Sequence, residues 1–175
     1  DTFSADLQNT QPTSFVSVPR LWMKFQSGIL SKMPQKKLDR LLAIPIISGL
    51  VKSKIKKQLG FSNCRFFGTG SAPTSPITLE WFRKLGIEIS EGWGMTETSC
   101  LSVINYPFNR EKMGTIGQPV EGTEIRISDQ GEILLKSDGV IKEYYKEPGK
   151  TAEAIRDGWL HTGDKGELDS GGYLR

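Results

Sequence analysis

The chain has 175 residues and a formal net charge of +3, with 37% hydrophobic and 25% charged residues. This composition is typical of a soluble globular protein and not of a disordered one. The excess of positive charge is too small and too dispersed to indicate a nucleic-acid partner. The longest apolar run, residues 41–51, is shorter than the ~20 residues of a membrane-spanning helix and is interrupted by Pro45.

The first 60 residues predict one strand followed by helices. Residues 15–18 predict a strand, and Pro19 opens a helix with apolar residues at helical spacing. A basic helical region then continues to Leu59, with four lysines between residues 52 and 57. We interpret these lysines as the solvated face of a helix, with a membrane surface or an acidic ligand as the alternative contact.

Two strands and a helix are expected between residues 64 and 90. Residues 64–67 predict a short buried strand that leads into a glycine turn at 68–73, and residues 87–90 predict the next strand. Between them, Ser75 is a typical N-cap and Pro76 a typical first helical residue. The apolar face expected for this helix, which Gly86 ends, consists of Ile77, Trp81, Phe82 and Leu85.

The alternation of strands and helices predicts an α/β fold with a parallel sheet and crossover helices. Ligands bind such sheets beyond the carboxyl ends of the strands. Two glycine-rich segments, 68–73 and 91–97, follow directly after expected strands. We therefore expect the two segments to line one crevice.

After Pro107 the pattern changes to short strands and glycine turns. Residues 123–127 and 132–136 flank a polar turn and predict a hairpin, and a short helix is expected over 151–155. We predict a small, mostly antiparallel β subdomain or distorted barrel over 106–175, after an α/β part over 1–105.

The two cysteines, Cys64 and Cys100, lie far apart, and neither has a partner at metal-ligand spacing. We predict that both are reduced core residues of a cytoplasmic protein. Peripheral attachment to the inner face of a membrane, through the basic helical region, is the alternative for its location.

The segment EGWGMTET at 91–98 combines groups that suit a nucleotide. Gly92 and Gly94 permit close approach of the backbone, and Trp93 offers a flat face on which a base can stack. Thr96 can donate a hydrogen bond to a phosphate oxygen, and the Glu97 carboxylate can bind Mg²⁺. The alternative is an ordinary turn, with Trp93 in the core and Thr96 capping a helix.

Two further turns extend this pattern. Asp164, in the segment HTGD at 161–164, has two carboxylate oxygens that can accept hydrogen bonds from both hydroxyls of a ribose. The turn Gly70–Pro73 presents backbone against which an adenine edge can pack. The sequence therefore predicts an ATP site built from three turns.

Taken together, these motifs resemble the adenylate-forming enzymes, which include acyl-CoA synthetases, luciferases and peptide-synthetase adenylation domains. The resemblance rests on GSAP at 70–73, EGWGMTET at 91–98, GTIGQPVEGTEIRI at 114–127, GEILLKS at 131–137 and WLHTGDKGELDSGGYLR at 159–175. The basic stretch before Gly60 is most similar to the long-chain acyl-CoA synthetases. The resemblance implies ATP- and Mg²⁺-dependent activation of a fatty acid to an acyl-adenylate, which coenzyme A then captures as a thioester.

The resemblance also implies roles for individual residues. Thr96 matches the phosphate-contacting threonine, Glu97 the magnesium ligand and Asp164 the ribose ligand, while Trp93 stands where the family usually has a tyrosine against the adenine. Gly92 and Gly94 are expected to help shape the acyl channel. The predicted cofactor-binding set is completed by Glu91, Met95, Gly70, Ser71, Ala72 and Pro73. We expect a structural role for His161, because a carboxylate substrate is already ionised at pH 7 and needs no general base.

By the same resemblance, the chain corresponds to the later part of a large amino-terminal domain. It contains no counterpart of the family's lysine-bearing phosphate loop or of its small carboxyl-terminal domain. We therefore expect the isolated chain to be inactive. Two alternatives remain open: an adenylation domain or short-chain acid ligase that loads a carrier protein, and a catalytically inactive nucleotide-binding relative.

Overall fold

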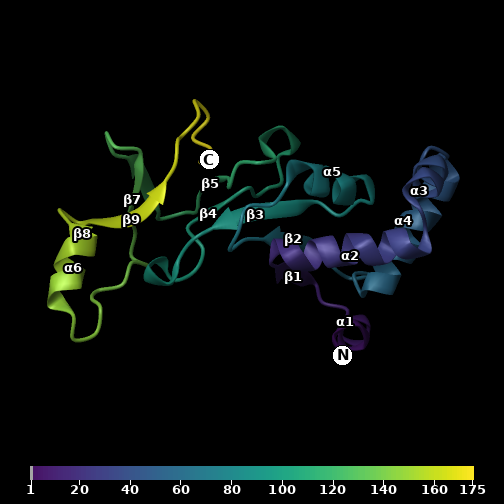
Figure 1. Cartoon of the computed structure of the whole chain (residues 1–175), viewed down its shortest axis with the longest axis horizontal. Coiled ribbons are helices and arrows are strands. Elements are labelled where there is room, and N and C mark those ends of the chain that lie inside the picture. Colours follow the sequence, from purple (N-terminus) through teal and green to yellow (C-terminus); the bar gives the residue numbers. More distant parts are fainter. Residues whose placement is uncertain (1) are drawn as a thin grey trace. The chain divides into compact units, whose positions relative to one another are not determined.

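The computed structural model describes residues 2–175. The chain divides into two compact units, one ending at Ser90 and the other beginning at Glu91. Figure 1 labels their helices and strands. The division of the sequence predicted near residue 105 stays a prediction. Within residues 2–175, no helix has the length and apolar character that crossing a bilayer requires.

The first unit is mainly helical and contains a pair of parallel strands. Its elements are α1 (Phe3–Thr10), β1 (Ser14–Ser17), α2 (Pro19–Lys32), α3 (Gln35–Leu42), α4 (Pro45–Leu59), β2 (Phe66–Thr69) and α5 (Pro76–Lys84). β1 and β2 pair in parallel, with Phe15 opposite Phe67, and α2, α3 and α4 lie in the crossover between them. The α/β class and the helical region up to Leu59 are thus confirmed.

Aromatic side chains fill the core of the first unit. Trp22 is fully buried, and the rings of Phe61 and Phe82 lie 6.0 and 5.1 Å from its ring. The indole N–H of Trp22 donates to the carbonyl oxygen of Gly68 at 3.2 Å, so its one polar atom is satisfied inside the core. This contact joins α2 to the strand that leads into the glycine-rich turn at 70–73.

Three details of this unit differ from the predictions. β2 continues through Gly68 and Thr69, which were expected in a turn, because both residues pair with β1. Ser75 precedes α5 as expected, but its hydroxyl makes no capping hydrogen bond. The burial predicted for Ile77 is wrong: its side chain is 81% exposed, because α5 turns Thr78 and Leu79 toward the core instead.

The second unit contains antiparallel sheets. Its elements are β3 (Ile89–Trp93), η1 (Thr96–Thr98), β4 (Val103–Ile104), η2 (Arg110–Lys112), β5 (Gln118–Pro119), β6 (Glu124–Ile127), β7 (Glu132–Lys136), α6 (Pro148–Ala154), β8 (Ile155–Arg156) and β9 (Trp159–Lys165). The first two residues of β3 belong to the first unit. β3, β4 and β5 pair in sequence, whereas the second sheet has the order β6-β7-β9-β8. The predicted hairpin is confirmed, with Ile125 opposite Leu135. The short helix is also confirmed as α6, although it begins at Pro148 and Ile155 belongs to β8. It packs against β8 and β9 (Figure 1).

The core of the second unit joins residues far apart in the sequence. Val103, Ile133 and Leu174 are buried together, and the half-buried Trp93 packs against them. The expected core position of Cys100 is wrong, because Cys100 is exposed; Cys64 is half-buried, and both thiols are free.

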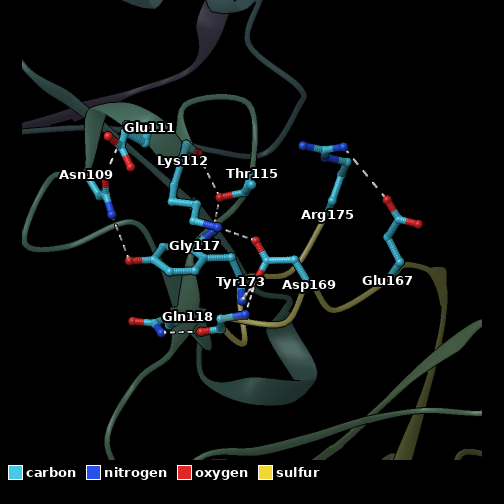
Figure 2. Close-up of polar contacts among 11 residues, drawn as sticks. Asn109, Glu111, Lys112, Thr115, Gly117, Gln118, Glu167, Asp169, Tyr173 and Arg175 are labelled. Atoms are coloured by element: carbon cyan, nitrogen blue, oxygen red, sulfur yellow. Dashed lines mark hydrogen bonds and ion pairs between the residues drawn. The ribbon is translucent and has the colours of Figure 1, made fainter.

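Polar contacts tie the loop around η2 to the segment 167–175 (Figure 2). The Lys112 ammonium donates to the Asp169 carboxylate at 2.5 Å and lies 4.8 Å from the centre of the Tyr173 ring. The second Asp169 oxygen accepts hydrogen bonds from the backbone N–H groups of Gly171 and Tyr173 at 2.8 and 3.0 Å. The hydrogen bond from Lys112, helped by that from Tyr173, lowers the pKa of Asp169 to about 2.

Candidate active site

The segment 91–98 begins as a strand and ends as one turn of 3₁₀ helix. Residues up to Trp93 belong to β3, where Gly92 lies opposite Ile104, so the turn expected from Glu91 onward begins only at Gly94. A β-carbon on Gly94 would lie 1.7 Å from the carbonyl oxygen of Cys100. Only glycine therefore fits at this position without displacing the backbone.

Hydrogen bonds hold the turn after Gly94 in an unusual conformation. Ser99 and Cys100 both have positive φ angles, 57° and 89°, which are costly for residues other than glycine. The Thr98 hydroxyl stabilises the turn, because it accepts hydrogen bonds from the Met95 backbone N–H at 3.1 Å and from the Ser102 hydroxyl at 2.7 Å. Thr98 is buried while Thr96 is exposed, so Thr96 is the hydroxyl available to a ligand.

The structure brings Trp93 and Asp164 together, as a shared site requires. The indole N–H of Trp93 donates to Oδ2 of Asp164 at 3.0 Å, although the two residues are 71 positions apart in the sequence. Trp93 is the last residue of β3, and Asp164 lies near the end of β9. Asp164 is exposed and Trp93 half-buried, so both remain accessible to a ligand.

Glu97 has a partner that the sequence did not predict. The Tyr144 hydroxyl donates to Oε1 of Glu97 at 2.9 Å, and the backbone N–H of Ile141 donates to the Glu97 carbonyl oxygen at 2.8 Å. The hydrogen bond with Glu97 raises the pKa of Tyr144, because the phenol donates its proton to the carboxylate. Tyr144 and Glu97 are 47 positions apart, and no local pattern connects them.

The side chain of Glu91 is buried and forms a hydrogen bond within the protein. Glu91 is only 7% exposed, and its Oε2 accepts a hydrogen bond from the backbone N–H of Gly114 at 2.8 Å. Burial raises the pKa of this carboxyl group. The predicted contributions of Glu91 and Met95 to nucleotide binding stay predictions.

The glycine turn expected at 161–164 is wrong, because these residues belong to β9, and there Glu132 links His161 to Gly163, next to Asp164. Nδ1 of His161 lies 3.0 Å from Oε2 of Glu132, while Oε1 of Glu132 accepts a hydrogen bond from the Gly163 backbone N–H at 3.0 Å. The hydrogen bond with His161 lowers the pKa of Glu132. Both contacts of the Glu132 carboxylate thus join β7 to β9. A structural role for His161, as expected, is consistent with these contacts.

The turn Gly70–Pro73 belongs to the first unit. It is closed at its base by a 3.2 Å hydrogen bond between the buried hydroxyls of Thr69 and Thr74. Within the turn, Ser71 has a positive φ of 64° and is exposed, as are Ala72 and Pro73. The backbone of this turn is accessible, and its expected proximity to the segment 91–97 stays a prediction.

The residues present fit a Mg²⁺ ion that is shared with a phosphate ligand. No group of three or more His, Cys, Asp and Glu side chains that could hold a metal exists within residues 2–175. Glu97 is half-buried, and Tyr144 hydrogen-bonds to only one of its carboxylate oxygens. Mg²⁺ commonly binds through one or two carboxylates together with substrate phosphates and water, which suits a site with a single carboxylate.

The model of the AMP-binding enzyme family matches residues 1–145. The chain therefore belongs to the AMP-binding enzyme family, and the resemblance to adenylate-forming enzymes is confirmed. Among its relatives, the peroxisomal long chain acyl-CoA synthetase 7 of Arabidopsis thaliana is 35% identical over 97% of this chain and 29% of its own length. The long-chain-fatty-acid–CoA ligase FadD15 of Mycobacterium bovis is 32% identical over 98% of this chain and 34% of its own.

A solved structure supports the same assignment. The o-succinylbenzoate coenzyme A synthetase (MenE) of Bacillus subtilis, in complex with ATP and magnesium ion, is 26% identical to this chain with a TM-score of 0.68. The match covers 98% of this chain and 33% of that structure. The chain thus spans about a third of the length of the curated relatives it matches.

Proposed function

We propose that the protein containing this chain activates a long-chain fatty acid with ATP and transfers the acyl group to coenzyme A. The observation that carries this proposal is the contact between Trp93 and Asp164, beside the turn that presents Thr96 and Glu97. This arrangement offers one group each for a base, a ribose, a phosphate and a cation. The fatty-acid–CoA ligases among the relatives support the class of acid and the thiol acceptor.

The reaction has two steps. A carboxylate oxygen of the acid attacks the α-phosphorus of ATP, the bond to the pyrophosphate oxygen breaks, and an acyl-adenylate forms. The sulfur of coenzyme A then attacks the acyl carbon, AMP leaves, and a thioester remains. The acid is already ionised at neutral pH, so the first step requires no general base.

Each residue of the site has a distinct task in this scheme. Trp93 stacks on the adenine, Asp164 accepts hydrogen bonds from the ribose, and Thr96 donates to a phosphate oxygen. Glu97 holds the cation, with Tyr144 fixing one of its oxygens. When bound, Mg²⁺ neutralises charge on the phosphate oxygens.

The test of this assignment is Glu97→Gln in the full-length protein. We expect acid-dependent pyrophosphate release to fall by at least ~10-fold, because the variant loses the charge that holds the cation. Glu143→Gln is the matched control, because Glu143 is exposed and adjacent to Tyr144 but has no assigned task. An unchanged rate of pyrophosphate release in Glu97→Gln would show that Glu97 does not bind the cation.

Peripheral attachment to a membrane through α4 is a further part of the proposal. Ile46 and Leu50, 82% and 69% exposed, lie on the same helix as the exposed Lys54 and Lys57. Exposed apolar and cationic groups together favour an anionic lipid surface. Cosedimentation with phosphatidylserine vesicles should weaken when the lysines between 52 and 57 are changed to glutamine, and an unchanged result would exclude this use.

A further inference from the structure

The indole of Trp93 makes a polar contact with Asp164 in addition to presenting a flat face. An aromatic ring that only stacked on a base could be replaced by any other flat ring. The indole N–H is a donor only, and here it is directed at Oδ2 of Asp164 at 3.0 Å. Among the described residues, Oδ1 of Asp164 accepts no hydrogen bond from the protein.

Trp93 is held firmly enough to position the carboxylate. Its ring packs against the core formed by Val103, Ile133 and Leu174. Its backbone is paired with Val103 in the ladder between β3 and β4. The N–H group therefore has a fixed direction, whereas the Asp164 side chain is exposed and has no other side-chain partner in residues 2–175.

From this geometry we infer that Trp93 is a positioning residue for ribose recognition, which it serves by orienting Asp164. The inference rests on the proposed nucleotide site. The indole N–H binds Oδ2 and leaves Oδ1 directed at the sugar hydroxyls, so recognition of the base and of the ribose is coupled through one side chain. Trp93 stands where the family usually has tyrosine, and tyrosine has no indole N–H.

The test compares three nucleotides that do not react: AMP, 2′-deoxy-AMP and 3′-deoxy-AMP. Their affinities for the full-length protein are measured by calorimetry in the wild type and in Trp93→Phe, which keeps a flat ring but lacks the N–H. We expect the wild type to prefer AMP, and Trp93→Phe to reduce this preference by about 3- to 10-fold, the range expected for one lost hydrogen bond. Affinity for at least one deoxy nucleotide should change less than affinity for AMP.

Trp159→Phe is the matched control. Trp159 lies on the same strand as Asp164, but its ring packs against the Arg126 guanidinium at 4.3 Å. All three affinities should remain at the wild-type values in this variant. If Trp93→Phe does not fold, Trp93→Met removes the N–H group without supplying another donor, and the preference for AMP over the deoxy nucleotides should fall in the same way.

The possible outcomes separate the inference from the proposed function. Equal weakening of all three nucleotides by Trp93→Phe, or a preference that stays at the wild-type value, would overturn the positioning role of Trp93. In either case the ATP site itself would stand. A wild type that binds AMP and the deoxy nucleotides equally would instead contradict ribose recognition by Asp164, which belongs to the proposed function.

Discussion

At Gly94 the fold leaves no room for a side chain. Because a β-carbon would lie 1.7 Å from the Cys100 carbonyl oxygen, Gly94→Ala must displace the turn that carries Thr96 and Glu97. We expect a loss of about 3 kcal/mol in the free energy of unfolding of the full-length protein, the cost of severe overpacking. Nucleotide binding should weaken as well. Chemical unfolding and calorimetry measure the two effects.

Gly149→Ala is the control for this change. Gly149 lies in α6, and no atom is within 4 Å of the position that its β-carbon would occupy. Alanine should therefore leave stability unchanged or increase it slightly. Wild-type stability in Gly94→Ala would show that the turn adapts, and the argument for a fixed nucleotide turn would fail.

Tyr144 is expected to set the affinity for Mg²⁺ through Glu97. In Tyr144→Phe the ring remains, but the hydrogen bond to Oε1 of Glu97 is lost. Loss of such a supporting partner typically weakens metal binding by about 10-fold or more. The Mg²⁺ concentration that gives half-maximal pyrophosphate release should rise accordingly. Tyr145→Phe is the control, because Tyr145 is 80% exposed, and equal behaviour of the two variants would contradict this role for Tyr144.

For individual residues, the sequence indicates which types of side chain form the site but not which residues they hydrogen-bond to. Glycines, a tryptophan and carboxylates in turns predicted the components of a nucleotide site. The hydrogen bonds of Trp93 with Asp164 and of Tyr144 with Glu97 join residues 71 and 47 positions apart. Such contacts depend on how the strands pair, and no local pattern in the sequence encodes them.

Among the structural elements, the loop around η2 provides a prediction about pH. The pKa of Asp169 is about 2 in the folded protein. Because the pKa of an unfolded aspartate is about 3.9, the contact with Lys112 contributes stability above roughly pH 4 and loses it as the pH falls toward 2. Asp169→Asn should therefore lower the free energy of unfolding at pH 6 and have a smaller effect at pH 3.

A nearby ion pair supplies the control for this pH dependence. Glu167 and Arg175 are both mostly exposed, and their closest charged atoms are 3.9 Å apart (Figure 2). Exposed pairs of this kind contribute little, so Glu167→Gln should change stability little between pH 3 and pH 6. Urea unfolding of the full-length variants tests both expectations. The same loss at pH 3 and pH 6 in Asp169→Asn would contradict the role assigned to the Asp169 carboxylate.

Several element types were predictable from local patterns, but strand β9, which includes residues expected in a turn, and several boundaries were not. β2 and β3 extend through Gly68 and Gly92, which sequence reasoning placed in turns. In both cases pairing with a neighbouring strand keeps the glycine extended. The hairpin of β6 and β7 was predictable, because both strands and the polar turn between them are adjacent in the sequence.

For the whole molecule, the family assignment followed from motifs spread along the chain, and the family model confirms it over residues 1–145. The acid chain length and the acceptor thiol could not be predicted from these motifs, because they depend on how pockets are lined in the complete enzyme. The chain spans about a third of the length of its curated relatives, so these properties must be measured on the full-length protein.

The most direct measurement is AMP formation by the full-length protein, with and without coenzyme A, across straight-chain acids from acetate to palmitate. We predict that turnover peaks with long-chain acids and that sustained AMP formation requires coenzyme A, because thiol capture releases AMP from the acyl-adenylate. ATP binding without turnover of any acid in the series would contradict the account, since the nucleotide site would then serve a different purpose.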